Sequence, residues 1–108
     1  MVTLPQRFDI WLVDLNPTRG SEINKTRPCV VVSPNELENL ATVLMAPMTT
    51  KGFAFPSRVV VTFQGQQGLI LLDQIRAVDK QRLLKKLGSL DQHTSIALCQ
   101  TLTEMFSL

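Results

Sequence analysis

Short apolar runs rich in β-branched residues recur along this chain, and each run ends at a group of turn-forming residues. The runs span residues 8–15, 28–32, 42–48, 58–63, 69–72 and 74–78. Runs of this length are typical of β-strands, whereas helices need longer segments with a period of three to four residues. The sequence therefore predicts a mostly β protein.

The connections between these runs predict how strands pair. Residues 64–68, Gln-Gly-Gln-Gln-Gly, indicate a turn, so the runs at 58–63 and 69–72 should lie antiparallel. The run at 74–78 alternates polar and apolar residues, as a strand with one face in water does. One helical turn is expected at 35–40, after a Ser or Asn cap.

A short helix is predicted after the last of these runs. Asp79 is expected to cap it, and it should continue through Leu84. Cationic residues and a glycine follow, which is typical of a helix C-terminus. These residues are Lys85, Lys86 and Gly88.

A longer helix is predicted at the end of the chain. Ser89 and Gln92 have the spacing of a capping box, and the helix should run to the chain terminus. Its apolar residues recur every three or four positions, at Ile96, Cys99, Leu102 and Phe106.

Successive short strands followed by one helix predict a particular architecture. We expect a strongly bent antiparallel sheet, forming a small SH3-like β-barrel, with the C-terminal helix packed against it. A chain of 108 residues, of which 44% are hydrophobic, has room for one compact core. Residues 1–108 are therefore expected to form a single domain.

Charge and composition exclude several classes of protein. The formal net charge is only +2, so general attraction to nucleic acid is weak and a histone-like function is excluded. No leader-like opening and no apolar run of bilayer length occur, so we expect a cytoplasmic protein that does not enter a membrane. Cys29 and Cys99 are expected to be buried, reduced thiols. With His93 as the single histidine, neither a metal site nor any other cofactor is expected.

Motifs of common enzyme classes are absent from the sequence. There is no P-loop, no dinucleotide-binding glycine pattern, no G-x-S-x-G elbow and no H-E-x-x-H helix. A lone His93 is more often a surface residue than a catalyst. Ribonuclease mechanisms that use two histidines as acid and base are also excluded.

Polar residues gather instead at the ends of predicted strands. They form the loop at 19–27, the corner at 49–51, and Asp73-Gln74 with Arg76. Arg27 directly precedes a buried strand, and Pro28 holds the local backbone extended, so its guanidinium is well placed to clamp a phosphate.

Structural roles explain the same residues equally well. Arg27 could form an ion pair with Glu22 or Asp73. The hydroxyl groups at 49–50 could satisfy free backbone groups at a strand end. Asp73 and Gln74 could hold a loop by hydrogen bonds to its amides. Composition alone leaves the choice open.

Four ordered segments of the chain resemble the MazF/PemK family of toxins. They are Asp9–Glu22 with its Asn16-Pro17-Thr18-Arg19-Gly20, Thr26-Arg27-Pro28 with the valine-rich strand and Ser33-Pro34, Ala46–Thr50, and Leu71–Arg76. Together they extend over most of the chain, from Phe8 to the terminal helix.

The resemblance implies a homodimeric toxin with an SH3-like barrel that cleaves single-stranded RNA without a metal and is neutralised by a cognate antitoxin. It implies that Arg27 and Thr49 are the catalytic pair, and that Glu22 is a carboxylate of the same site. Asp73, Gln74 and Arg76 would lie near bound RNA. Some family members carry a His and an Arg where this chain has Ser21 and Leu71, so their acid and base assignments do not transfer.

Ribonuclease chemistry is compatible with these residues. The 2′-hydroxyl of RNA can attack the adjacent phosphorus, so the protein must supply charge stabilisation, proton transfer and alignment. Candidate RNA-binding residues outside the catalytic pair are Lys25, Thr50, Lys51 and Arg58, each of which could also be ordinary solvated surface. Phe53 and Phe55 fit core or dimer packing better than base stacking.

Two other functions remain possible at this stage. The same barrel serves a non-catalytic toxin that binds and poisons DNA gyrase, which would not require Arg27 with Thr49. An adaptor on an SH3-like barrel would need an exposed aromatic groove, and a chain with no Tyr and one Trp supports that poorly.

Overall fold

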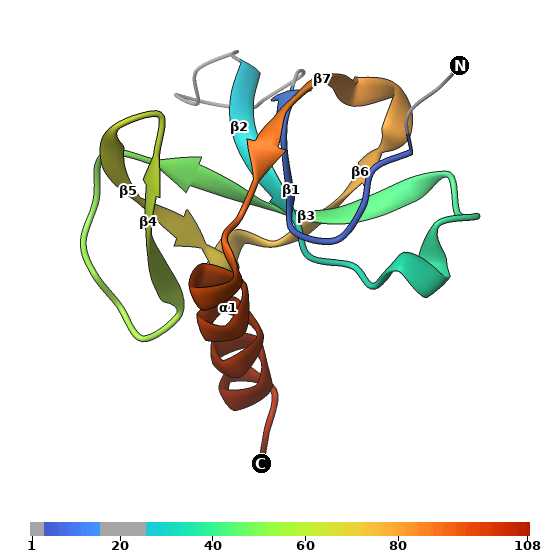
Figure 1. Ribbon diagram of the computed structural model, residues 1–108. Coiled ribbons are helices and arrows are strands. Elements are labelled where there is room, and N and C mark those ends of the chain that lie inside the picture. Colours follow the sequence, from blue (N-terminus) through green and yellow to red (C-terminus); the bar gives the residue numbers. More distant parts are fainter. Residues whose placement is uncertain (1–3, 16–25) are drawn as a thin grey trace, which may run out of the picture.

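The structure is a computed structural model that describes residues 4–15 and 26–108 (Figure 1). Within these residues the strands are β1 (Asp9–Asp14), β2 (Thr26–Val31), β3 (Thr42–Thr49), β4 (Arg58–Phe63), β5 (Gln66–Leu71), β6 (Arg76–Asp79) and β7 (Leu83–Ser89). Short 3-10 helices are η1 (Asn35–Leu37), η2 (Leu72–Gln74) and η3 (Lys80–Arg82), and helix α1 spans Gln92–Met105.

All of these strands pair antiparallel in one curled sheet, in the order β4-β5-β3-β2-β1-β7. Strand β3 is the centre of the fold, because it pairs with β6 through residues 42–45, with β2 through 45–47 and with β5 through 48–49. Changing partners along one strand bends the sheet, and α1 lies at one end of it beside β4 (Figure 1). The predicted mostly β, SH3-like barrel class with a C-terminal helix is confirmed.

Both faces of the central strands are buried. Even-numbered residues in the inner parts of β2 and β3, such as Val30 and Ala46, belong to a core that includes Leu98 of α1, whereas Leu44 is exposed. Odd-numbered residues, such as Val31 and Met45, belong to a second core on the other face. A strand buried on both sides reads as an unbroken apolar run, which explains why these segments show no alternation in the sequence. Each fully buried Val or Met side chain contributes about 2 kcal/mol by burial.

The β4–β5 hairpin is tighter than the sequence predicted. Its turn consists of Gln64 and Gly65, with φ angles of 54° and 77°. Positive φ at both positions is the geometry of a two-residue type I′ turn, whose twist matches that of paired strands. Strand β5 therefore begins at Gln66, and the predicted run at 69–72 covers only its second half and the first residue of η2.

The short helix predicted from Asp79 to Leu84 is wrong. Asp79 does accept a hydrogen bond from the Gln81 amide, but only the 3-10 turn η3 follows. The residues expected to end that helix lie in strand β7, which pairs with β1. Lys86 there forms an ion pair with the buried Asp9, with Nζ and Oδ1 3.3 Å apart.

Helix α1 begins later than the predicted capping box. The Asp91 side chain accepts a hydrogen bond from the Thr94 amide at 2.7 Å, so Asp91 rather than Ser89 is the N-cap. The predicted apolar face is only partly buried, because Ile96 and Phe106 are exposed. At η1, likewise, no side chain caps the turn that was expected after Ser or Asn.

Both cysteines are free. Cys29 is buried and Cys99 only half-buried, so the prediction of two buried thiols is right for Cys29 alone. No helix in residues 4–15 and 26–108 combines the length and apolarity needed to cross a bilayer.

Candidate active site at the separation of two strands

Strands β2 and β3 separate at a proline. Directly after β2, the Val32 amide donates to the Leu44 carbonyl of β3. Because backbone groups alternate in direction along a strand, the even-numbered residues of β2 also direct their N–H and C=O groups toward β3. Pro28 would be the donor at the far end of this ladder, but proline has no N–H. The pairing accordingly ends at Cys29 and Pro47, and β3 continues with β5 as its partner.

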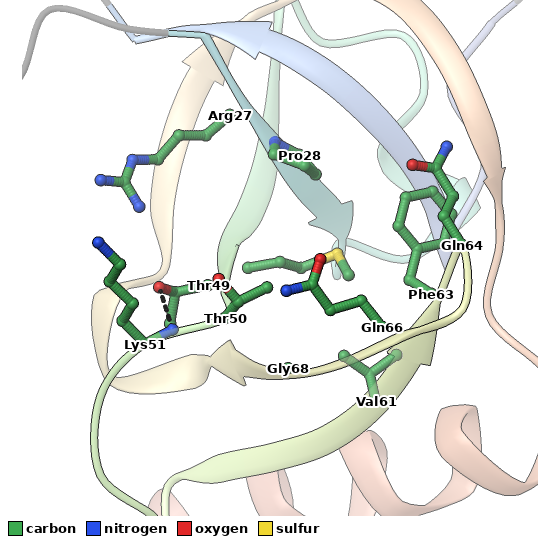
Figure 2. Close-up of a pocket in the computed structure, with 11 residues that line it drawn as sticks. Arg27, Pro28, Thr49, Thr50, Lys51, Val61, Phe63, Gln64, Gln66 and Gly68 are labelled. Atoms are coloured by element: carbon green, nitrogen blue, oxygen red, sulfur yellow. Dashed lines mark hydrogen bonds between the residues drawn. The ribbon is translucent and has the colours of Figure 1, made fainter.

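The separation creates a gap between two side chains. Continuing the β2–β3 register by two residues places Arg27 opposite Thr49. Both side chains line the same two hollows, and Lys51 is the one other residue that lines both. Figure 2 shows the side chains of Arg27 and Lys51 directed toward each other, with the Thr49 hydroxyl beside them. Residues far apart in sequence therefore meet at one point.

The first hollow, which we call the glutamine hollow, has a volume of about 430 Å³. It lies between β2 and the β4–β5 hairpin, and Figure 2 shows the glutamine side chains on the side away from Arg27. Besides the three shared residues it is lined by Pro28, Met48, Thr50, Val61, Phe63, Gln64, Gln66 and Gly68.

The second hollow, which we call the cationic hollow, has a volume of about 490 Å³. Four of its lining residues are cations, namely Arg27, Lys51, Arg58 and Arg76. No Asp or Glu is among the described residues that line it. Clustered cations with Gln74 as a further hydrogen-bonding group suit an anion such as a phosphate.

Two of these cations lie near one buried thiol, that of Cys29. Burial raises the pKa of Cys29 to about 12, and the positive charges of Arg76 and Arg27 oppose that rise. Both guanidinium groups therefore act on the same point of the sheet, although they come from β6 and β2.

The Thr49 hydroxyl is oriented by its own turn. Its Oγ1 accepts a hydrogen bond from the Lys51 amide at 3.1 Å, drawn as a dashed line in Figure 2. Because this bond uses a lone pair of the oxygen, the hydroxyl hydrogen is left to donate elsewhere. Thr49 can therefore donate to an oxygen of a bound phosphate.

Arg58 and Asp73 pair with each other. Arg58 Nε lies 3.2 Å from Asp73 Oδ1, and Nη2 lies 3.4 Å from Oδ2. The hydrogen bond from Arg58 is the main reason that the pKa of Asp73 is lowered. An ion pair between Arg27 and Asp73, one of the two structural alternatives for Arg27, is therefore wrong. The other proposed partner, Glu22, lies outside the described residues.

The remaining predicted site residues divide into two groups. Thr50 lines the glutamine hollow, and Gln74 and Arg76 line the cationic hollow. Glu22 and Lys25 lie outside the described residues. In the described ranges, no three His, Cys, Asp or Glu side chains are grouped so that they could hold a metal ion.

The sequence did not predict the residues of the β4–β5 hairpin that line the glutamine hollow. Phe63, Gln64 and Gln66 line the glutamine hollow because β5 pairs with the end of β3 that carries Thr49. The Gln-Gly pair marked the turn, but no local signal indicates which strand the hairpin lies beside.

Comparisons with known proteins identify the family of this chain. A sequence model of the PemK-like, MazF-like toxins of type II toxin-antitoxin systems matches residues 6–106. The chain is 37% identical over 76 residues to the endoribonuclease toxin MazF of Escherichia coli K12, covering 69% of this chain and 68% of the relative. It is 34% identical over 94 residues to the endoribonuclease EndoA of Bacillus subtilis, covering 80% of each.

Solved structures show the same fold. MazF from Deinococcus radiodurans superimposes with a TM-score of 0.81 at 20% identity, covering 99% of this chain and 100% of that one. A mycobacterial endoribonuclease, solved in complex with its cognate antitoxin, superimposes with a TM-score of 0.78 at 22% identity, covering 93% and 92%.

Proposed function

Because the chain belongs to the family of PemK-like, MazF-like toxins of type II toxin-antitoxin systems, we propose that it is a sequence-specific endoribonuclease that cleaves single-stranded RNA without a metal ion. Its curated relatives are named as endoribonucleases. The observation that carries the proposal is the position of Arg27 opposite Thr49 where the two hollows meet.

The reaction uses the RNA's own nucleophile. The 2′-hydroxyl oxygen forms a bond to the adjacent phosphorus while the bond from phosphorus to the 5′ oxygen breaks. One proton leaves the 2′-hydroxyl, and one is added to the departing oxygen. The products are a 2′,3′-cyclic phosphate and a 5′-hydroxyl end, and DNA resists cleavage because it has no 2′-hydroxyl.

Arg27 and Thr49 act on the charge that develops in the transition state. The Arg27 guanidinium stabilises the negative oxygens of the phosphorane, and Thr49 donates a hydrogen bond to one of them. A preorganised donor of this kind is worth about 3 kcal/mol. A guanidinium keeps its protons at neutral pH, so the role of Arg27 is electrostatic rather than that of an acid. Glu22 is the candidate proton acceptor, on resemblance alone.

The two hollows suit the parts of an RNA strand on either side of the cut. In the cationic hollow, Lys51, Arg76 and Gln74 suit a neighbouring phosphate. The amides of Gln64 and Gln66 can hydrogen-bond base edges, and the Phe63 ring offers a surface for stacking. Thr50 adds a further hydroxyl, and Lys25 stays a candidate on resemblance.

Family membership suggests the partners. A mycobacterial neighbour is known in complex with its cognate antitoxin, so we propose that a cognate antitoxin binds this toxin too. We further propose a cytoplasmic homodimer in which residues 1–108 form a single toxin domain. The alternative of a non-catalytic gyrase poison gains no support from the comparisons.

Cleavage assays in EDTA test the proposal. Wild type, Arg27→Ala and Thr49→Ala are incubated with a mixed-sequence single-stranded RNA, and both new ends are mapped. We expect wild type to give 5′-hydroxyl ends at one short motif, and each variant to lose at least about 100-fold in rate. A wild type that is inert on every RNA would refute the proposal, and a need for added metal would refute its metal-independent form.

A further inference from the structure

The loop between β3 and β4 carries Lys51 into the site. It covers residues 50–57, and its two largest side chains, Phe53 and Phe55, are exposed, so they do not anchor it in a core. Of their two predicted uses, core packing is wrong and dimer packing stays a prediction. The Lys51 amide donates to Thr49 Oγ1 at the start of the loop, and the rest of the loop has further polar contacts.

Arg58 supplies two hydrogen bonds to this loop and a cation–π contact. Its Nη1 donates to the Phe53 carbonyl at 2.9 Å, and its guanidinium carbon lies 4.8 Å from the centre of the Phe55 ring. Its backbone amide donates to the Phe55 carbonyl at 2.9 Å. One side chain thus holds the loop at two places.

The same guanidinium is tied to the opposite wall of the cationic hollow. Asp73, which accepts from Nε and Nη2, lies in η2 directly before Gln74. The Ser57 hydroxyl also donates to Asp73, at 3.1 Å. The pair therefore joins the loop that carries Lys51 to the segment that carries Gln74 and Arg76.

We propose that Arg58, held by Asp73, is a positioning residue that sets the spacing of the cationic hollow for an RNA phosphate. Arg58 does not act as a phosphate contact, because the Asp73 carboxylate balances its charge. Its guanidinium already donates hydrogen bonds to Asp73 and to the Phe53 carbonyl. The inference rests on the proposed function, because it concerns how that RNA is held.

The ion pair between Arg58 and Asp73 should matter more for the position of the loop than for the stability of the fold. The two side chains are 15% and 35% exposed, and exposed ion pairs contribute little to folding. The backbones of Arg27 and Thr49 lie on paired strands, so they are held without the part of the loop that Arg58 contacts. Loss of the pair should therefore weaken RNA binding while the fold and the chemical step persist.

A charge-removing variant of Asp73 gives the sharpest test. Binding is measured with an RNA that carries a single 2′-deoxynucleotide at the mapped cut, and kcat and KM are measured with the cleavable RNA. We expect Asp73→Asn to weaken binding about tenfold, with kcat within about threefold of wild type. Simple electrostatics predicts the opposite, because Asp73→Asn removes a negative charge beside a polyanion.

The second test measures whether the effects of changing Arg58 and Asp73 on RNA binding are coupled. Arg58→Gln should weaken binding by a similar factor, and the double variant should bind no worse than either single variant, because both remove one contact. Ser57→Ala, which removes one hydrogen bond to Asp73, should have a smaller effect in the same direction. Lys85→Gln, which removes an exposed cation on β7, is the matched control and should change binding less than about twofold.

The outcomes distinguish this inference from the proposed function. Wild type that cleaves RNA, together with Asp73→Asn that binds as tightly as wild type or more tightly, overturns the positioning role alone. Additive losses in the double variant also overturn it. Wild type that neither binds nor cleaves RNA overturns both. Thermal unfolding of each variant shows that a weakened binder is still folded.

Discussion

Arg27 and Thr49 stand opposite each other across the gap between β2 and β3, two residues beyond the last paired residues of those strands. Both sit on strand backbone that is fixed on its other side, Arg27 by pairing with Val13 and Thr49 by pairing with Leu69. Groups held on paired strands keep their geometry better than groups on loops, so the pair is preorganised for a phosphate.

The Thr49 hydroxyl, rather than the bulk of its side chain, should carry its role. Thr49→Val keeps the shape but removes both the donor and the acceptor for the Lys51 amide. We expect kcat/KM for RNA cleavage to fall at least about 100-fold in Thr49→Val and to stay within about tenfold of wild type in Thr49→Ser. Equal rates in Thr49→Val and wild type would exclude the hydroxyl from the mechanism.

Gly68 should be needed for the position of Thr49. A Cβ at residue 68 would lie 2.6 Å from the Thr49 carbonyl oxygen, which is backbone and cannot move aside cheaply. Gly68→Ala should therefore destabilise the fold by about 1–3 kcal/mol and lower the cleavage rate by displacing Thr49. Denaturant unfolding and kcat measure the two effects.

Gly65→Ala is the matched control for Gly68→Ala. Residue 65 has a φ of +77°, so an alanine there strains the turn, but no atom lies within 4 Å of the added Cβ. It should cost about 1–2 kcal/mol of stability without lowering kcat. If Gly68→Ala is as stable and as active as wild type, the close approach has no functional consequence.

Local sequence patterns were sufficient for most strands but not for β7. Residues Leu83–Ser89 contain two lysines and no β-branched residue, so they match a helix end as well as a strand. They form a strand because β1 has an unpaired edge and because Lys86 meets the buried Asp9. Such pairing is a tertiary effect that no local pattern contains.

The candidate site was predictable only in part, because some of its residues are brought together by tertiary pairing. The family resemblance pointed to Arg27 and Thr49, and Pro28 explains locally why β2 ends its pairing there. The glutamine hollow depends on the strand order β4-β5-β3, which is non-local. The pairing of Asp73 with Arg58 rather than with Arg27 likewise follows only from how the hairpin packs.

Cys29 should be chemically inert in the folded protein. Its pKa is raised to about 12, so at pH 8 only about one thiol in ten thousand is the reactive thiolate, and the side chain is buried as well. We expect iodoacetamide to leave Cys29 unmodified at pH 8 in the native state and to modify it after unfolding in guanidinium. Peptide mass spectrometry locates the label, and alkylation of native Cys29 would contradict its burial.

Acid should release the contact between Arg58 and Asp73. The pKa of Asp73 is lowered in the folded state from its ordinary value of 3.8, chiefly by the hydrogen bond from Arg58. A carboxyl whose pKa is lowered on folding stabilises the fold above its ordinary pKa and loses that contribution as pH falls through the folded-state value. The melting temperature of wild type should therefore exceed that of Asp73→Asn by a constant amount from about pH 5 upward. The difference should shrink as pH falls below that ordinary value, because the Asp73 carboxylate of wild type then takes up a proton and both proteins approach an uncharged group at this position. A difference that is the same at all pH values would mean that the Asp73 charge contributes nothing to holding the loop.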